Sequence, residues 1–138
     1  MTELVRDIMT KDIVTIDYNK TTLEAAKLMT DRGISSLIVT VNDQPQGIVT
    51  ERDFIKKICL KDLSLDKVKV SEIMSKIRTF ATPDTPLDVA IQRMVNNKVR
   101  RLPILNEKGF LVGIITVTDL AKHLRTILLL EGAVSLNY

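Results

Sequence analysis

Two threonine–aspartate pairs with the same spacing are the residues of this sequence best suited to chemistry. Thr50 and Asp53 occur in the phrase GIVTERD, and Thr116 and Asp119 occur in the phrase GIITVTD. An acidic residue three positions after a Thr forms a capping box at a helix start, here with Asp in place of the usual Glu. A carboxylate at a strand-to-helix junction can also accept both hydrogens of a ribose diol, as an acidic residue does in dinucleotide-binding folds. The four residues alone fit either role.

A basic cluster, KVRR at residues 98–101, is the second feature with chemical potential. Arg forms planar, bidentate contacts with phosphate that Lys cannot reproduce. The other basic residues are spread along the chain, and the net charge is only +3. Arg100 and Arg101 therefore fit either a phosphate contact or an ordinary solvated basic patch.

The sequence offers no set of residues for catalysis. Its only His, His123, lies one helical turn beyond Asp119, and a lone His on a helix is more often a surface or core residue than a catalytic one. The Cys-His spacing of a zinc site is absent, as are the phosphate-binding motifs GxxxxGKS/T and GxGxxG. We therefore expect a protein that is not an enzyme and that uses no metal and no catalytic cofactor.

Composition excludes several other classes of protein. Hydrophobic residues make up 45% of the 138 residues, which supports a packed core. The longest apolar run, ILLL at 127–130, is far too short to span a membrane, and the N-terminus lacks the pattern of a signal peptide. The single Cys, Cys59, suits the cytoplasm, and we expect it to be a small core residue. With 4% aromatic residues and no Trp, binding of nucleic acid is not indicated.

An internal repeat must position these residues. VRDIMT from residue 5 matches VSEIMS from residue 70, and AAKLM matches AIQRM at the same offset of 65. We expect two copies, 1–62 and 63–138, joined by a solvated polar connector, KDLSLDKVKV. A unit of about 65 residues buries too little surface to be comfortably stable alone, so the copies should pack against each other.

Both copies predict the same order of elements. A helical turn ends at Met9 or Met74, and a strand follows at 13–16 or 77–80. An amphipathic helix comes next, which Gly33 ends in the first copy. A buried strand at 36–41 or 102–105 then forms a hairpin that leads into the threonine–aspartate phrase and a closing helix. The apolar positions predicted for the helices are Leu23, Ala26, Met29, Phe54, Ile55, Ile58, Leu87, Ala90, Ile91, Met94, Val95, Leu120, Leu124, Ile127 and Leu128.

This β-α-β-β-α order predicts an α/β (α+β) fold with mixed sheets that carry helices on one face. Packed as a pseudo-two-fold pair, the two copies would leave clefts between them.

These motifs resemble a known family. The paired VxxIM starts, the helix ending in Met, RRLPI and the doubled GhhTxxD phrase, with h an apolar residue, are similar to a tandem pair of CBS domains, or Bateman module, over nearly the whole chain. The resemblance implies a stand-alone regulatory module that binds AMP, ADP, ATP or S-adenosylmethionine between its motifs and senses energy state. It also implies a homodimer, which the apolar run before the tail EGAVSLNY favours, and an unidentified partner protein that is regulated in trans.

The resemblance assigns residues to each cleft. In the first cleft the ribose, phosphates and base would meet Ile48, Thr50, Asp53, Lys98, Val99, Arg100, Arg101 and Pro103. In the second they would meet Ile34, Ser35, Ser36, Ile114, Thr116, Thr118 and Asp119. The adenine-lining positions would be Thr15, Ile16, Thr79 and Phe80, which also fit as ordinary strand residues. Because the second cleft has serines in place of the Arg pair, we expect tighter phosphate binding in the first.

Two functions from different classes fit this sequence. The favoured one is a module that senses adenine nucleotides or related adenosyl ligands and signals to a partner protein. The alternative is an interaction or scaffold module with vestigial clefts, which touches nucleic acid through its Lys and Arg side chains.

Overall fold

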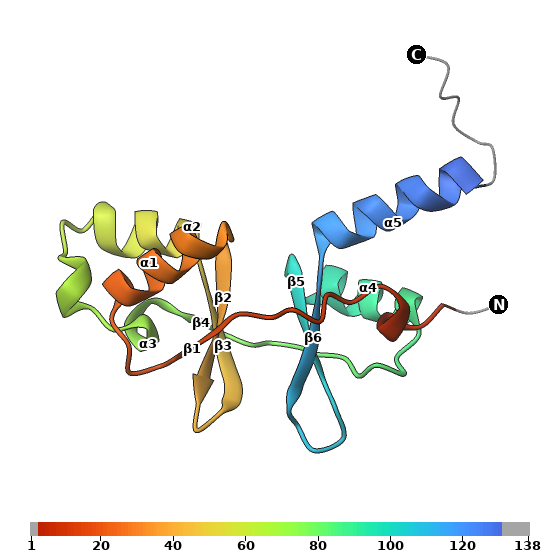
Figure 1. The fold of residues 1–138 in the computed structure, drawn as a ribbon, viewed down its shortest axis with the longest axis horizontal. Helices are drawn as coiled ribbons and strands as arrows, with labels where there is room; N and C mark the ends of the chain where they lie inside the picture. Colours follow the sequence, from red (N-terminus) through yellow and green to blue (C-terminus); the bar gives the residue numbers. More distant parts are fainter. Residues whose placement is uncertain (1–2, 131–138) are drawn as a thin grey trace, which may run out of the picture. The chain divides into compact units, whose positions relative to one another are not determined.

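The computed structural model describes residues 3–130, which divide into two compact units (Figure 1). The hairpin-1 unit is Ile13–Arg78. The hairpin-2 unit combines residues 3–12 with residues 79–130. The units therefore differ from the sequence copies 1–62 and 63–138, because the start of each copy packs in the unit built on the hairpin of the other copy. The predicted tail, EGAVSLNY, lies outside the described residues.

The hairpin-1 unit contains a four-stranded mixed sheet in the order β1-β2-β3-β4. β1 pairs in parallel with β2, and β3 pairs antiparallel with both β2 and β4. The strands are β1 (Thr15–Asp17), β2 (Ser36–Val41), β3 (Gln44–Thr50) and β4 (Ser75–Lys76). The helices lie to one side of β2 and β3 (Figure 1), and they are α1 (Thr22–Arg32), α2 (Glu51–Phe54), the π-helical η2 (Ile55–Cys59), the 3-10 turn η3 (Leu65–Lys67) and α3 (Val70–Ile73).

Both ends of α1 are set by local chemistry. Thr21 Oγ1 accepts the Glu24 amide at 3.1 Å, and Glu24 Oε2 accepts the Thr21 amide at 2.9 Å, which completes a capping box. The bond from the Thr21 amide holds the pKa of Glu24 below its usual value. Gly33 ends the helix in the left-handed conformation, with φ of 62°, and the predicted helix end is confirmed.

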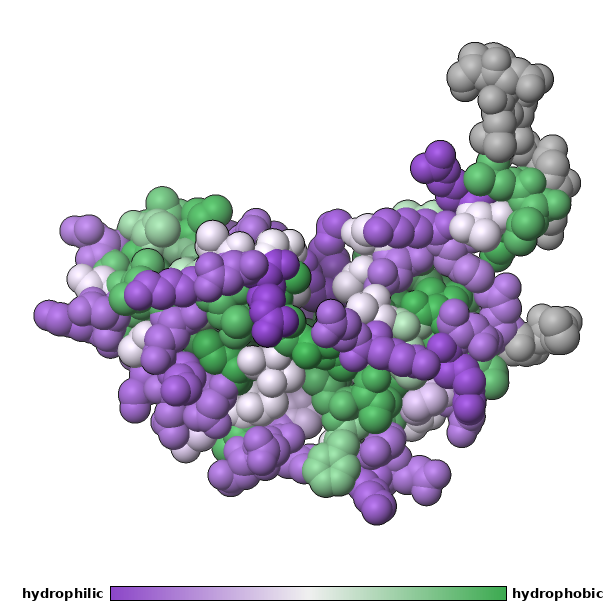
Figure 2. Space-filling model, viewed as in Figure 1, coloured by the Kyte–Doolittle hydropathy of each residue, from purple (hydrophilic) through white to green (hydrophobic). Residues whose placement is uncertain are grey.

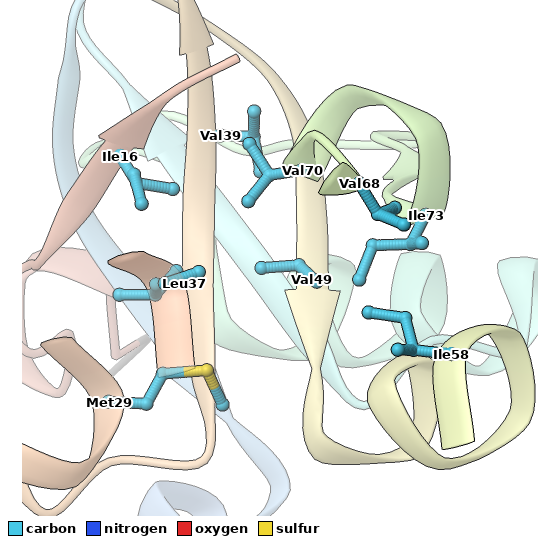
Figure 3. Close-up of a cluster of buried hydrophobic side chains, with 10 residues drawn as sticks. Ile16, Met29, Leu37, Val39, Val49, Ile58, Val68, Val70 and Ile73 are labelled. Atoms are coloured by element: carbon cyan, nitrogen blue, oxygen red, sulfur yellow. The ribbon is translucent and has the colours of Figure 1, made fainter. Parts of the chain in front are cut away.

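A cluster of buried apolar side chains fills the space between this sheet and its helices (Figure 3). Val68, Val70 and Ile73 belong to it, although they lie in or just after the predicted polar connector. The charged residues of the connector are exposed, as expected, so its alternating valines tie it to the core. The remaining members are Ile16, Ala25, Met29, Leu37, Val39, Val49 and Ile58.

The hairpin-2 unit repeats this plan with fewer regular strands. Its hairpin, β5 (Arg101–Leu105) with β6 (Leu111–Thr116), is flanked by single bridges at Ala81 and Thr10. Ala81 pairs in parallel with β5, as β1 pairs with β2, and Thr10 pairs antiparallel with β6, as β4 pairs with β3. The other elements are the 3-10 turn η1 (Val5–Asp7), α4 (Leu87–Asn97) and α5 (Val117–Leu130). The mixed α/β fold predicted from the sequence is confirmed.

Several sequence expectations differ from the structure. Residues 77–80 form no strand, and the pairing that corresponds to that of β1 is a single parallel bridge at Ala81, just after them. Cys59 is exposed rather than buried, because η2 closes with a wider i to i+5 turn, from the Leu60 amide to the Ile55 carbonyl at 3.0 Å, which shifts the residues behind it. The α4 residues Ile91 and Val95 are 38% and 64% exposed.

Exposed apolar residues also occur on the closing helices. Ile55 is 55% exposed, and Leu124 and Leu130 on α5 are 57% and 82% exposed. None of the residues of α5 is fully buried, and the space-filling view shows apolar surface at its outer end (Figure 2). Leu120 alone among its residues packs against the core of the hairpin-2 unit, whose buried members are Val5, Ala81, Leu87, Ala90, Met94, Leu102, Ile104 and Ile115.

A methionine from the start of one copy lies on the hairpin glycine of the other copy in each unit. A Cβ added to Gly47 would stand 2.5 Å from Met74 Sδ, and one added to Gly113 would stand 2.6 Å from Met9 Sδ. Real Cβ atoms do not approach sulfur so closely, so a side chain at either position would force the methionine to shift. The absence of a side chain at Gly47 and Gly113 thus lets the start of each copy pack closely on the other copy's hairpin.

We predict that Gly47→Ala lowers the free energy of unfolding by about 1–3 kcal/mol, as overpacking does elsewhere. Gly113→Ala should cost less, because the added Cβ would meet only atoms of the flexible Met9 side chain, whereas a Cβ at Gly47 would also stand 3.0 Å from the backbone oxygen of Ser75. Urea denaturation measures both effects.

The double variant Gly113→Ala with Met9→Ala serves as the control. It should be more stable than the sum of the two single effects implies, since the small side chain relieves the clash. Simple additivity would show that the methionine does not impose the glycine.

Candidate functional site

In the hairpin-1 unit Thr15, Ser36, Ile48 and Thr50 share the sheet face opposite the core, whereas Ile34 packs against the core. Side chains alternate along a strand, and directly paired residues point to the same face. Leu37, Val39 and Val49 point into the core, so their neighbours point away from it. Ser36 pairs with Thr50, and Ile38 pairs with Ile48. Ile34 and Ser35 precede this strand, and the Ser35 carbonyl accepts the Glu51 amide at 3.1 Å.

The hairpin-2 unit shows the same alternation. Leu102, Ile104 and Ile115 are core residues, and the predicted site residues lie between them. Arg101 pairs with Thr116, and Pro103 pairs with Ile114. The structure thus brings Arg101 and Pro103, predicted for the first cleft, beside Thr116 and Ile114, predicted for the second.

The backbone continues this side-by-side arrangement beyond the hairpin. The Arg100 carbonyl accepts the Val117 amide at 3.1 Å. Arg100 and Thr118 are exposed, while Val99 packs against the core of the unit. The basic cluster and the second threonine–aspartate phrase therefore occupy one end of one hairpin.

The Asp53 carboxylate is buried, with 9% of the residue exposed. Its Oδ2 accepts the Thr50 amide at 2.8 Å and the Thr50 hydroxyl at 3.2 Å. Its Oδ1 lies 3.1 Å from Lys57 Nζ, and the same ammonium donates to the Ile73 carbonyl at 2.7 Å. The aspartate is thus the cap that the spacing predicts, and it is also half of an ion pair.

The Asp119 carboxylate is held by an equivalent cap. Its Oδ2 accepts the Thr116 amide and the Thr116 hydroxyl, each at 3.0 Å. The Asp119 amide in turn donates to Thr116 Oγ1 at 3.2 Å. The predicted capping role of both phrases is therefore seen directly, and in each case a single carboxylate oxygen makes the capping bonds.

Of the four positions predicted to line an adenine, Ile16 is buried in the core and the other three are at least partly exposed. Thr15 pairs with Ile38 and shares the face away from the core, whereas Ile16 is 7% exposed and packs in the core. Phe80 is 48% exposed, and its carbonyl accepts Arg93 Nη1 at 2.9 Å. Thr79 precedes it and is half-buried. Of the two β1 residues Thr15 and Ile16, only Thr15 has its side chain on the sheet face opposite the core, here called the site face.

Sequence reasoning missed two residues that the structure places with the others. Ile38 lies on the site face, between Thr15 and Ile48 in the pairing. Lys57 binds the Asp53 carboxylate from the next helical turn. The alternation of β2 and the i to i+4 spacing from Asp53 were the available signals for these two residues.

Lys98 has a strained backbone. It ends α4 with φ of 54°, in the left-handed conformation that Gly33 adopts at the end of α1. A residue with a Cβ loses roughly 1–2 kcal/mol in this conformation. An exposed Lys kept where the other copy has Gly is the kind of strain that collects at functional sites.

Residues 3–130 contain neither a cluster of metal-ligating side chains nor a membrane-spanning helix. No three His, Cys, Asp or Glu side chains in this range gather closely enough to hold a metal ion. No helix in this range is long and apolar enough to cross a membrane.

Comparison with known proteins identifies the family. The model of the CBS domain matches residues 5–60 and again residues 70–126. The chain therefore belongs to the CBS domain family and carries two copies of the domain.

Solved structures of CBS proteins share this fold. A protein with CBS domains from Burkholderia ambifaria superposes with a TM-score of 0.81 at 32% identity, covering 90% of this chain and 95% of that one. The CBS domain pair of protein MJ0100, solved with 5′-methylthioadenosine and S-adenosyl-L-methionine, gives a TM-score of 0.80 at 26% identity and covers 91% and 98% of the two chains. Among curated relatives, MK0525 of Methanopyrus kandleri is 35% identical over 117 residues, which is 84% of this chain but only 60% of that protein.

We predict that Lys98→Gly raises the free energy of unfolding by about 1 kcal/mol, because Gly adopts the left-handed conformation without strain. Chemical denaturation checks this. The matched control is Asn96→Gly within α4, which should lower stability by a few tenths of a kcal/mol. Equal losses in both variants would show that Lys98 is not strained.

Proposed function

We propose that this CBS pair is a regulatory module that binds an adenosyl ligand and passes the binding signal to a partner protein. The observation that carries the proposal is the pair of threonine–aspartate caps, each of which uses one carboxylate oxygen for the helix and leaves Oδ1 outside the cap. A carboxylate fixed in this way is pre-organised to accept ribose hydroxyls, since its orientation is set before the ligand arrives.

The family comparison supports an adenosyl ligand. The CBS pair of MJ0100 is solved with 5′-methylthioadenosine and S-adenosyl-L-methionine, and both ligands contain adenosine. Among the ligands we propose for this chain are AMP, ADP, ATP and S-adenosylmethionine. Thr15, Ile48 and Ile114, on the faces turned away from the cores, are proposed to contact the base, together with Ile34, which precedes β2 and packs against the core of the hairpin-1 unit.

The basic cluster is proposed to bind the phosphates. Arg100 and Lys98 are exposed, and the strain at Lys98 supports a functional role for it. Our sequence-based assignment gives these side chains to the ligand of Asp53, and gives Ser35 and Ser36 to the ligand of Asp119. Within the hairpin-2 unit Arg101 is paired with Thr116, so assignment to the ligand of Asp119 is the competing outcome that the experiment must separate.

We also propose that the module acts as a homodimer and in trans. Exposed apolar side chains on one helix, such as Leu124 and Leu130 on α5, are the kind of surface that pairs with another protein. A cytoplasmic location and an energy-sensing role follow only from the sequence argument and belong to the proposal. A ligand shifts such a module only if it binds one arrangement more tightly than another.

We predict that at least one adenosyl ligand raises the melting temperature, because a ligand that binds only the folded state stabilises it. AMP, ADP, ATP and S-adenosylmethionine are titrated to millimolar concentration. Asp53→Ala should abolish one site and Asp119→Ala the other. No shift with any of the four ligands would refute the proposal, and a steep salt-dependent affinity for nucleic acid would favour the scaffold alternative.

The Arg pair is assigned by adding Arg100→Ala and Arg101→Ala to each aspartate variant. Our assignment predicts that they weaken AMP, but not adenosine, when only the Asp53 site is intact. The same loss seen only when the Asp119 site is intact would move the phosphate contact to the other ligand.

A further inference from the structure

We propose that Lys57 makes the two ribose sites unequal, so that Asp53 accepts one ribose hydroxyl while Asp119 accepts two. The inference rests on the proposed function, in which each aspartate holds a ribose. It assigns Lys57 as a positioning residue that determines which sugars the Asp53 site tolerates.

The acceptor positions of Asp53 are nearly all in use. An ionised carboxylate has about four lone-pair positions, two on each oxygen. The amide and hydroxyl of Thr50 occupy both positions of Oδ2, at 2.8 and 3.2 Å. The Lys57 ammonium, 3.1 Å from Oδ1, occupies one more. One acceptor position of the carboxylate remains for a ligand.

Asp119 has more acceptor capacity. Its Oδ2 is occupied by the amide and hydroxyl of Thr116, as in the other copy. Within residues 3–130 no side chain forms an ion pair with it, and its Oδ1 accepts no hydrogen bond. Two acceptor positions remain, which is enough for both hydrogens of a ribose diol.

The residue four positions after each aspartate explains the difference. In the first copy it is Lys57, and in the second it is His123. His123 Nε2 pairs with Glu3 Oε2 instead of turning back to Asp119. The residue at this helical position thus binds the capping aspartate in the first copy and Glu3 in the second.

Lys57 is held in place independently of Asp53. Its ammonium also donates to the Ile73 carbonyl at the end of α3, at 2.7 Å, and its side chain is 37% exposed while that of Asp53 is 12% exposed. A ligand that displaced Lys57 from Oδ1 would have to break a second, shorter contact or rotate the ammonium about it. The anchored lysine therefore keeps its share of Oδ1 when a sugar binds.

The test compares sugars that lack one hydroxyl at each site separately. Asp119→Ala leaves the Asp53 site, and Asp53→Ala leaves the Asp119 site. Calorimetry then measures the Kd of AMP, 2′-deoxy-AMP and 3′-deoxy-AMP, with the same three forms of 5′-methylthioadenosine as an uncharged series. Loss of a hydrogen bond to a charged group weakens binding by roughly tenfold or more.

At the Asp53 site one deoxy analogue should bind within about threefold of its parent and the other should lose roughly tenfold. At the Asp119 site both analogues should lose roughly tenfold. Lys57→Met in the Asp119→Ala background should free the last position of Oδ1, so that the tolerated analogue now loses roughly tenfold as well. Lys57→Arg should keep the tolerance.

Lys56→Met is the matched control, because it removes the same charge from an exposed neighbouring lysine. It should leave the discrimination unchanged. Equal discrimination at the two sites, or no response to Lys57→Met in a folded variant, overturns the inference while leaving ribose binding intact. Binding that survives in the double variant Asp53→Ala with Asp119→Ala instead refutes the proposed function itself.

Discussion

The contact of a methionine with a bare hairpin backbone is the constraint on which both units depend. Each hairpin has one edge and one stretch of backbone that its own copy does not cover, and the start of the other copy supplies both the pairing residue and the methionine. Gly47 and Gly113 make this approach possible. Because of this exchange, neither copy alone contains every segment that completes its sheet.

The strands that contain Gly47 and Gly113 also position the candidate binding site. The residues that follow each glycine continue the same strand, whose alternate side chains leave the core and whose end begins a helix. The strand end places Thr50 and Thr116 where they start α2 and α5, and the aspartates three positions later return to cap those starts. A helix cap and a ligand-binding carboxylate are therefore compatible roles, since the cap uses Oδ2 and leaves Oδ1 to other partners.

Much of this arrangement was predictable from the sequence. The doubled phrases, the alternation of SLIVTV and the Gly33 helix end predicted the mixed fold, the hairpins and both caps. Residues 77–80 were misassigned because β-propensity does not say where the partner strand lies, and here the pairing with β5 is a single bridge at Ala81. Cys59 was misplaced because a π-helical turn is not visible in an apolar pattern that assumes 3.6 residues per turn.

The role of Lys57 was hidden for a different reason. Its spacing from Asp53 allows an ion pair but does not require one, and His123 at the matching position pairs elsewhere. The partner that a side chain at this position binds depends on which carbonyls and carboxylates the rest of the fold brings within reach. Here the decisive group is the Ile73 carbonyl, which belongs to the start of the other copy.

We propose that the capped aspartates, Asp53 and Asp119, hold the ribose of an adenosyl ligand. A crystal structure grown with a mixture of AMP, ADP, ATP and S-adenosylmethionine tests it most directly, because it shows which ligand is bound and by which atoms. We predict ribose hydroxyls within hydrogen-bonding distance of Oδ1 of Asp53 or Asp119, with the Oδ2 caps intact. An adenosyl ligand bound away from both carboxylates, or no bound ligand at all, would contradict it.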